Sequence, residues 1–231
     1  MALPVIQAPK FTMTLPTGEQ VQYRPFTHKE QKNLLITAEG GGEQDVLQGI
    51  ITLVDDCTFN KVDWASLPAV DLEYAFIHIR AKSIGEVVEM RWQCHSKKDG
   101  KKCGHTNTVE ADIRTAKAEP MPETTIKVTD DIAIVLDQVT PADVIRMAGG
   151  ATTEDILFEK VKMVVHGDEV TTEFTKEEFT PFVESFPAEA SRAVDEFFKK
   201  QATMVLNVPV TCAKCGSQSE LTIKGALNFF G

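Results

Sequence analysis

The first half of the chain begins with short runs in which apolar and polar residues alternate. Residues 11–15 and 21–23 alternate on either side of a turn at residues 16–18, which predicts a β-hairpin. A helical pattern follows, and Thr27 with Glu30 three residues later is typical of a capping box. The rest of this half predicts two further helices and two strands, in order at residues 46–54, 72–79, 88–94 and 109–113.

The second half repeats this order. Residues 125–128 and 132–136 flank a turn, which predicts a second hairpin. Thr140 is followed by Pro141 at the first helical position and by Asp143 three residues on, which predicts the next helix start. Two more helices and two strands are predicted, in order at residues 156–164, 188–198, 206–212 and 221–223.

The shared order of hairpin, helices, strand, cysteine pair and strand indicates an α+β fold built from two pattern-related halves. Chance similarity is the alternative, because few residues are identical between the halves. Two prolines and several charges between residues 116 and 123 favour a boundary there. We therefore expect an N-terminal half at residues 1–117, a linker at residues 118–123 and a C-terminal half at residues 124–231.

Each half carries a pair of cysteines between two predicted strands. Eight residues separate Cys94 from Cys103, two separate Cys212 from Cys215, and a glycine follows each pair. Two thiol pairs, each on a hairpin, are typical of a tetrahedral zinc site of the ribbon type. We expect these four cysteines to hold one Zn²⁺ per chain, shared by the two halves. Four cysteine ligands leave no open position, so such a zinc would be structural.

Disulfides and redox chemistry are the alternatives for these cysteines. The sequence starts without a secretory signal pattern and has no apolar run long enough for a membrane span, so we expect reduced thiols. A thioredoxin-like Cys-x-x-Cys normally opens a helix, whereas Cys212 lies between two strand patterns. Redox use or free thiols stay open. His95 and His105 flank the first pair and could replace a thiolate, and Cys57 is interpreted as a buried apolar residue.

Composition and charge are typical of an ordinary globular protein and exclude few functional classes. The chain has 231 residues, 42% of them hydrophobic, and a net charge of −10. This acidity argues against a general nucleic-acid or anionic-membrane surface. The basic run at residues 97–102 lies inside the first cysteine pair; we expect a solvated loop, with a nucleic-acid contact as the alternative.

Sequence motifs of catalysis are absent. There is no His-Glu-x-x-His, no Gly-x-Ser-x-Gly, no P-loop and no dinucleotide fingerprint. We therefore expect a protein that is not an enzyme. A nucleic-acid-binding zinc-ribbon protein and a thiol redox protein are the alternatives from other functional classes.

Three segments carry a family resemblance. They are residues 23–32, residues 71–86, and an ending in which the Cys-x-x-Cys-Gly motif is followed by an apolar strand and Gly225-x3-Phe229-Phe230. Together they resemble the T4-type bacteriophage baseplate hub and hub-assembly protein family. The resemblance implies a structural or chaperone-like protein of a contractile-tailed phage, found in the host cytoplasm during assembly. It leaves two alternatives open: a lasting part of the virion tail baseplate, or a transient assembly factor. It implies other baseplate and tail hub proteins as partners, with the tape measure protein as a further candidate.

Two parts of the chain are candidate partner surfaces. The helix at residues 71–80 should bury its apolar face and present its charged face, although a merely solvated face is the alternative. The two adjacent aromatic residues near the end of the sequence should either pack onto this chain or dock into a partner. The candidate partner-binding residues are Tyr74, His78, Arg80, Phe229 and Phe230.

Overall fold

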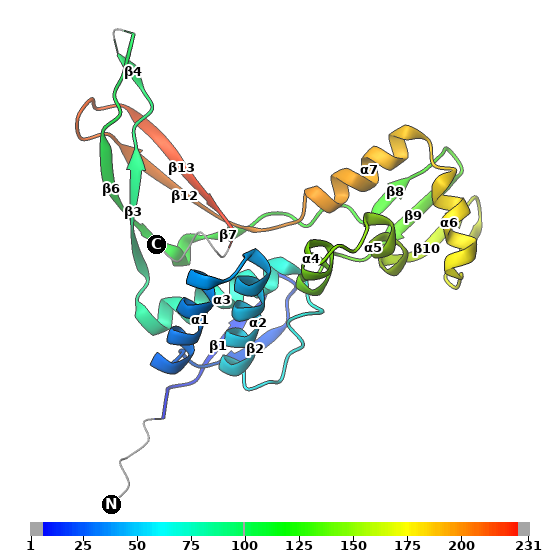
Figure 1. The fold of residues 1–231 in the computed structure, drawn as a ribbon, viewed down its shortest axis with the longest axis horizontal. Helices are drawn as coiled ribbons and strands as arrows, with labels where there is room; N and C mark the ends of the chain where they lie inside the picture. Colours follow the sequence, from blue (N-terminus) through cyan, green and yellow to red (C-terminus); the bar gives the residue numbers. More distant parts are fainter. Residues whose placement is uncertain (1–6, 99, 226–231) are drawn as a thin grey trace, which may run out of the picture.

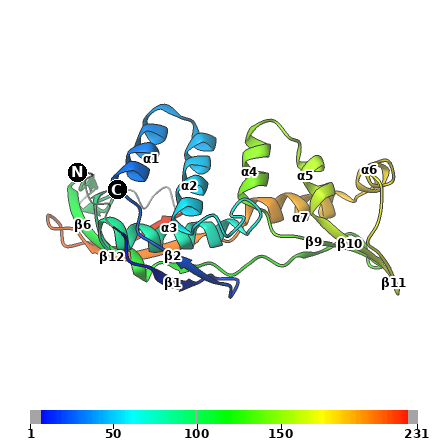
Figure 2. The same cartoon turned by 90° about the horizontal axis from the view of Figure 1, so that it is seen from below.

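Three buried apolar clusters divide the molecule into an N-terminal body, an arm and a C-terminal body (Figure 1). The structure is a computed structural model that describes residues 7–98 and 100–225, so Phe229 and Phe230 lie outside the described residues. Across those described ranges, seven α-helices and five small antiparallel sheets confirm the predicted α+β class. The arm and the C-terminal body lie toward opposite ends of the long axis (Figure 2).

The N-terminal body consists of one hairpin and three helices. Its elements are β1 (Phe11–Thr14), β2 (Gln20–Tyr23), α1 (His28–Gly40), α2 (Glu43–Cys57) and α3 (Ala69–Ile84). Thr27 and Glu30 form the predicted capping box at the start of α1. The hairpin and the start of α1 therefore follow local sequence signals.

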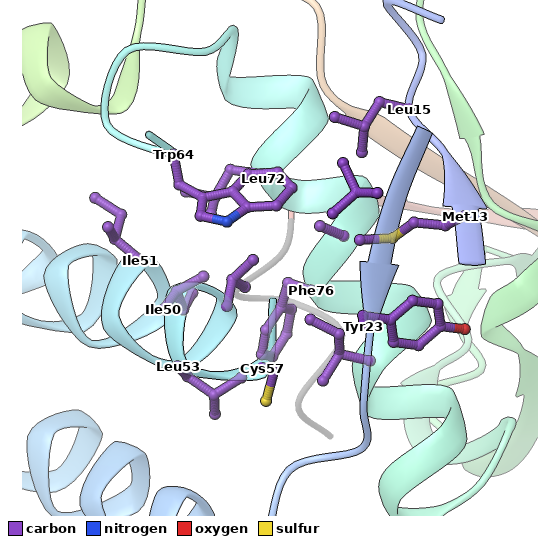
Figure 3. Close-up of a cluster of buried hydrophobic side chains, with 14 of the residues drawn as sticks. Met13, Leu15, Tyr23, Ile50, Ile51, Leu53, Cys57, Trp64, Leu72 and Phe76 are labelled. Carbon is purple, nitrogen blue, oxygen red and sulfur yellow. The ribbon is translucent and has the colours of Figure 1, made fainter. Parts of the chain in front are cut away.

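The core of this body is built from large apolar side chains that lie close together in the sequence. Figure 3 shows side chains from β1, β2 and α2 gathered around α3. Trp64 is 1% exposed, and its indole N–H donates to the Thr58 hydroxyl at 2.9 Å. Burying a side chain such as Phe76 or Leu72 stabilises the fold by about 1.5–3 kcal/mol. Apolar packing alone can thus hold this body together.

Helix α3 is buried on most of its surface because it packs against the rest of the N-terminal body on one side and against the arm on the other. Leu72 and Phe76 belong to the core of the body, whereas Ile77 belongs to the apolar cluster of the arm. Asp71 is fully buried and accepts a hydrogen bond from the Thr17 hydroxyl at 2.7 Å. We predicted that α3 buries its apolar face and exposes its charged face. The charged residue Asp71 is nevertheless buried, so the two faces are not fully separated.

Two long hairpins, one from each half of the sequence, form the arm. Their strands are β3 (Val87–Gln93) with β6 (Thr106–Asp112), and β12 (Met204–Thr211) with β13 (Gln218–Lys224). The predicted basic loop is a small hairpin, β4 (Lys97–Lys98) with β5 (Lys101–Lys102), placed between β3 and β6.

A short strand ties the two halves together within the arm. After the 3-10 turn η1 (Ile113–Thr115), β7 (Lys117–Ala118) pairs with β12. The predicted linker thus begins with a residue that is part of a strand. The apolar cluster of the arm also mixes the halves, since it packs Val88 and Ile113 with Leu206 and Ile223.

The C-terminal body consists of a four-stranded sheet and four helices. The sheet order is β11 (Glu169–Thr171), β10 (Val161–His166), β9 (Ile132–Leu136) and β8 (Thr125–Lys127). The helices are α4 (Pro141–Ala148), α5 (Thr153–Lys160), α6 (Lys176–Glu184) and α7 (Ala188–Lys199). Thr140 caps α4 as predicted, by accepting from the Asp143 N–H at 3.3 Å.

One predicted helix is too long. We expected it to continue through Val161 and Val164, but α5 ends at Lys160 and the following residues form β10, paired with β9. The segment Val-Lys-Met-Val-Val is rich in β-branched residues, which pack well on a pleated sheet. This segment therefore pairs with the free edge of β9 as a strand, although the spacing of its apolar residues also fits a helix. Among the helices of the described residues, none is long and apolar enough to span a membrane.

Candidate metal centre

The two cysteine pairs form turns with the same backbone hydrogen bonds. In the first, the Cys94 N–H donates to the His105 carbonyl at 2.9 Å and the Gly104 N–H donates to the Cys94 carbonyl at 3.0 Å. In the second, the Cys212 N–H donates to the Ser217 carbonyl and the Gly216 N–H donates to the Cys212 carbonyl, both at 2.9 Å.

Each turn depends on the glycine that follows its second cysteine. Gly104 and Gly216 have φ angles of 62° and 70°, a left-handed conformation that is costly for other residues. The turn then folds both sulfurs of a pair to the same side. This geometry explains why each pair carries the Cys-Gly ending that the sequence shows.

The four sulfurs meet in one place although the pairs are far apart in the sequence. All four Sγ atoms lie within 4.8 Å of one another. Two of these contacts join the two hairpins: Cys94 to Cys215 at 3.7 Å, and Cys103 to Cys212 at 3.8 Å. With metal–sulfur bonds of about 2.3 Å, the edges of an S₄ tetrahedron measure about 3.8 Å. A disulfide would need about 2.05 Å, so the arrangement fits a metal ion better than an S–S bond.

Two polar side chains of the first hairpin reach across to the second. The Ser96 hydroxyl lies 3.0 Å from the Cys94 sulfur and 3.1 Å from the Cys215 sulfur. The Asn107 side chain accepts from the Ala213 N–H at 2.9 Å, and its amide N–H approaches the Cys212 sulfur at 3.7 Å. Such contacts orient ligands and favour thiolates. Sequence analysis missed both residues; the available signal was a polar Asn at an inward position of β6.

Hydrogen bonds and burial set the acidities of the thiols. Burial alone would raise the pKa of Cys212, but N–H groups of Cys215 and Lys214 lower it to about 6. The hydrogen bond from Ser96 is the main cause that lowers the pKa of Cys215. For Cys103 the His105 N–H acts in the lowering direction, yet burial and the neighbouring sulfurs raise the pKa to about 11. A divalent cation would lower the pKa of Cys103 again, because it binds all four sulfurs as thiolates and its charge offsets theirs.

The remaining candidate ligands stay outside this cluster. Among the described residues, the group of side chains with converging ligand atoms consists of the four cysteines, without His95 or His105. Cys57 is fully buried in the core of the N-terminal body, as expected for a small apolar residue. Burial raises the pKa of the Cys57 thiol to about 12, so it is a poor nucleophile or ligand.

The candidate partner residues on α3 are only partly accessible. Arg80 is 6% exposed, and Tyr74 and His78 are half-buried, with their rings 4.1 Å apart. The Arg80 guanidinium donates to the Gly85 carbonyl at 3.4 Å, and its Nε has no partner within the described residues. Burial lowers the pKa of Arg80 and also that of His78. Their binding to a partner stays a prediction.

Comparison with known proteins gives one match. The model of the family described as T4 bacteriophage base plate protein matches residues 8–231, nearly the whole chain. No curated protein and no solved structure matches the sequence. The matched range includes all four cysteines and every described helix and strand.

Proposed function

Because this chain belongs to the T4 bacteriophage base plate protein family, we propose that it is a non-enzymatic structural or assembly protein of the tail baseplate hub. The family match confirms the resemblance to baseplate proteins seen in the sequence, and the hub role is the step we add. It acts by binding other baseplate and tail hub proteins, with the tape measure protein as a further candidate partner. It works in the host cytoplasm during assembly and takes its place in the virion tail baseplate.

We also propose that Cys94, Cys103, Cys212 and Cys215 hold one structural Zn²⁺. The observation that carries this proposal is the position of the four sulfurs: they come from two hairpins, one in each half of the sequence, and lie within 4.8 Å of one another. Four thiolates suit zinc, and iron is the other metal that favours tetrahedral sulfur. A bound Zn²⁺ would supply no open position for a substrate, and its role would be to fasten the two hairpins of the arm.

Metal analysis of the purified protein tests the site. We expect one zinc per chain, no loss in Cys57→Ala, and near-complete loss in Cys212→Ser. Replacement by Co²⁺ should give the absorption bands of a tetrahedral S₄ complex. A metal content near zero in the wild-type protein, or a disulfide found under reducing purification, would contradict the proposal.

The two halves are, in this proposal, copies of one unit, at residues 1–117 and 124–231 with a linker at 118–123. The matching hydrogen bonds of the two cysteine turns support this idea. Both halves also begin with a hairpin and a helix that starts at a threonine cap. The copies then differ by the added hairpin β4–β5 in the first half, and by the added hairpin β10–β11 and helix α6 in the second.

Shortening the first turn tests the equivalence. Replacing residues 95–102 by Ala-Lys, the two residues between Cys212 and Cys215, would convert the first pair into a second Cys-x-x-Cys-Gly. If the turns are equivalent, the shortened protein should still bind one metal ion per chain. Loss of the metal with an otherwise folded protein would show that the long first turn has its own geometry.

The baseplate role is tested on phage particles. Mass spectrometry of purified mature virions should detect this protein at a fixed ratio to other tail proteins. Its depletion from an infection should stop tail assembly at the baseplate, which electron microscopy of the lysate would reveal. Normal tails made without the protein would overturn the proposed role, whatever its metal content.

A further inference from the structure

The outer end of the arm is basic, in contrast to the rest of the molecule. We call residues 95–104 together with Lys214 the basic tip; they contain five lysines and one aspartate in a chain of net charge −10. The β4–β5 hairpin is the outermost part of the arm (Figure 1). Its cross-strand neighbours are Lys97 with Lys102 and Lys98 with Lys101. Like charges opposite each other destabilise a hairpin, so an acidic partner would stabilise it.

Four lysines of the tip are also exposed and form no ion pair with a described residue. Lys97, Lys101, Lys102 and Lys214 are exposed, and none of them has an ion-pair partner among the described residues. A Zn²⁺ with four thiolates carries a charge of about −2, which offsets part of this charge. Five lysines against one aspartate leave a positive excess even then.

The opposite end of the molecule is acidic. We call residues 168–178 the acidic end; they contain five acidic residues and one lysine, and Lys176 is already paired with Asp155. Asp168, Glu169 and Glu173 are exposed, and no ion pair joins them to a described residue. This end also includes β11, an edge strand on which Val170 is 57% exposed.

The basic tip and the acidic end lie at opposite ends of the long axis (Figures 1 and 2), so they cannot meet within one molecule. We propose that the basic tip of one copy docks on the acidic end of a second copy, head to tail. This rests on the proposed function in assembly and adds a partner to it. A head-to-tail contact leaves one free end of each kind, so it closes into a ring or continues as a chain of copies.

A second copy fits the tip better than a nucleic acid does. The tip has no Phe, Tyr or Trp for stacking on bases, and the whole chain is acidic. The same chain carries the complementary charge in an exposed position. Contacts between exposed charges are weak and screened by salt, since the Debye length falls from about 30 Å at 0.01 M to about 10 Å at 0.1 M.

Sedimentation velocity of the full-length, zinc-loaded protein tests the inference. At about 0.01 M salt the average mass should rise with protein concentration, and the association constant should fall on the order of tenfold by about 0.1 M. The triple variant Lys97→Glu, Lys101→Glu, Lys102→Glu should stay monomeric. So should the triple variant Asp168→Lys, Glu169→Lys, Glu173→Lys. A mixture of the two variants should associate again, because each then offers charges that the other lacks.

A matched control separates this contact from a general charge effect. Lys29, Lys32 and Lys61 are exposed in the N-terminal body, and changing all three to Glu alters the net charge equally. This control should associate as the wild type does. Circular dichroism and metal content of each variant verify that the fold and the zinc are kept.

Three results would overturn the inference. They are a monomer at every salt and protein concentration, an association that the tip variant leaves unchanged, and tighter binding of the tip to a 20-base-pair duplex than to a second copy. None of these results touches the zinc or the baseplate role, which the metal content of the same sample and the virion analysis decide separately.

Discussion

The N-terminal body and the arm are stabilised by different means. The core of the body comes from one continuous segment, from Met13 to Ile79, and contains large side chains such as Trp64 and Phe76. The core of the arm joins residues 70–113 to residues 202–223 and consists mainly of smaller aliphatic side chains. Four sulfurs lie at the far end of the arm, where its apolar cluster stops.

This difference shows where a metal ion is needed. Two-stranded hairpins are marginally stable by themselves, and joining ends of the chain that are about 100 residues apart costs entropy. Zinc binding to small cysteine-containing peptides yields about 10–16 kcal/mol, enough to offset such costs. The body has no such requirement, because its contacts are local and its core is apolar.

The largest effect should follow from removing one sulfur. Cys212→Ser should release the zinc and loosen both hairpins of the arm, because the two pairs share one ion. Hydrogen exchange should accelerate at residues 87–112 and 204–224 together, while α1 and α2 stay protected. Cys57→Ala, a cysteine change in the body, should leave the arm and its metal unaffected. Faster exchange in β12 and β13 alone would show that the pairs are not joined.

A cavity in the N-terminal body should have the opposite effect: it should destabilise the body and leave the zinc bound. Leu53 is 3% exposed in the core, and Leu53→Ala should lower the free energy of unfolding by about 2–5 kcal/mol. Denaturant unfolding with metal analysis should show a weaker body that keeps its zinc. The matched change Leu206→Ala, in the arm, should cost less because the metal still fastens the hairpins. Zinc loss from Leu53→Ala would mean that body and arm unfold as one unit.

A smaller effect is expected at the connection between the two regions. Glu73 on α3 accepts hydrogen bonds from the Thr203 hydroxyl and the Met204 N–H, both at 2.6 Å. Glu73→Ala leaves the Met204 N–H buried without this acceptor and should cost about 1–3 kcal/mol. Glu73→Gln keeps an acceptor oxygen and should lower the stability less. Thermal unfolding of both variants measures the difference. Equal losses in both variants would show that the negative charge matters more than the hydrogen bonds.

The smallest effect should depend on pH. Burial raises the pKa of Asp71, the opposing influence being its hydrogen bonds from Thr17. A carboxyl group with a raised pKa in the folded state destabilises the fold when ionised, and this cost disappears as the pH falls through the folded pKa. Asp71→Asn should therefore be slightly more stable than the wild type at pH 7, by less than about 1.4 kcal/mol.

The measurement is the free energy of unfolding of both proteins at a series of pH values. The stability difference between Asp71→Asn and the wild type should shrink as the pH is lowered, because the wild-type carboxyl group becomes protonated. Any metal loss at low pH affects both proteins equally and cancels in the difference. A difference that stays constant with pH would show that Asp71 is not the titrating group.

Local signals were sufficient for much of the fold. The hairpin before α1, the caps at Thr27 and Thr140, and the helix start at residue 188 all lie where the sequence predicts them. These features depend on a few neighbouring residues and on hydrogen bonds within one turn. The residue types and spacing of the two cysteine pairs likewise predicted a shared cluster.

Features that depend on distant neighbours were predicted less well. The segment after Lys160 has a spacing that fits a helix, and only the free edge of β9 makes it a strand. The charged positions of α3 are predicted to be exposed, yet packing on both sides buries Asp71 and Arg80. Ser96 and Asn107 were missed because their importance comes from a hairpin more than 100 residues away.

The sequence by itself determined the α+β class, the caps, the turns and the four cysteines, because each follows from the chemistry of adjacent residues. Only the tertiary structure decided that β3–β6 and β12–β13 lie side by side, and that α3 is covered from both sides. The reason is physical: such contacts depend on which surfaces remain to be buried after the local elements form. The spacing within each cysteine pair predicted the shared cluster, and the packing of the two hairpins against each other brings the four sulfurs together.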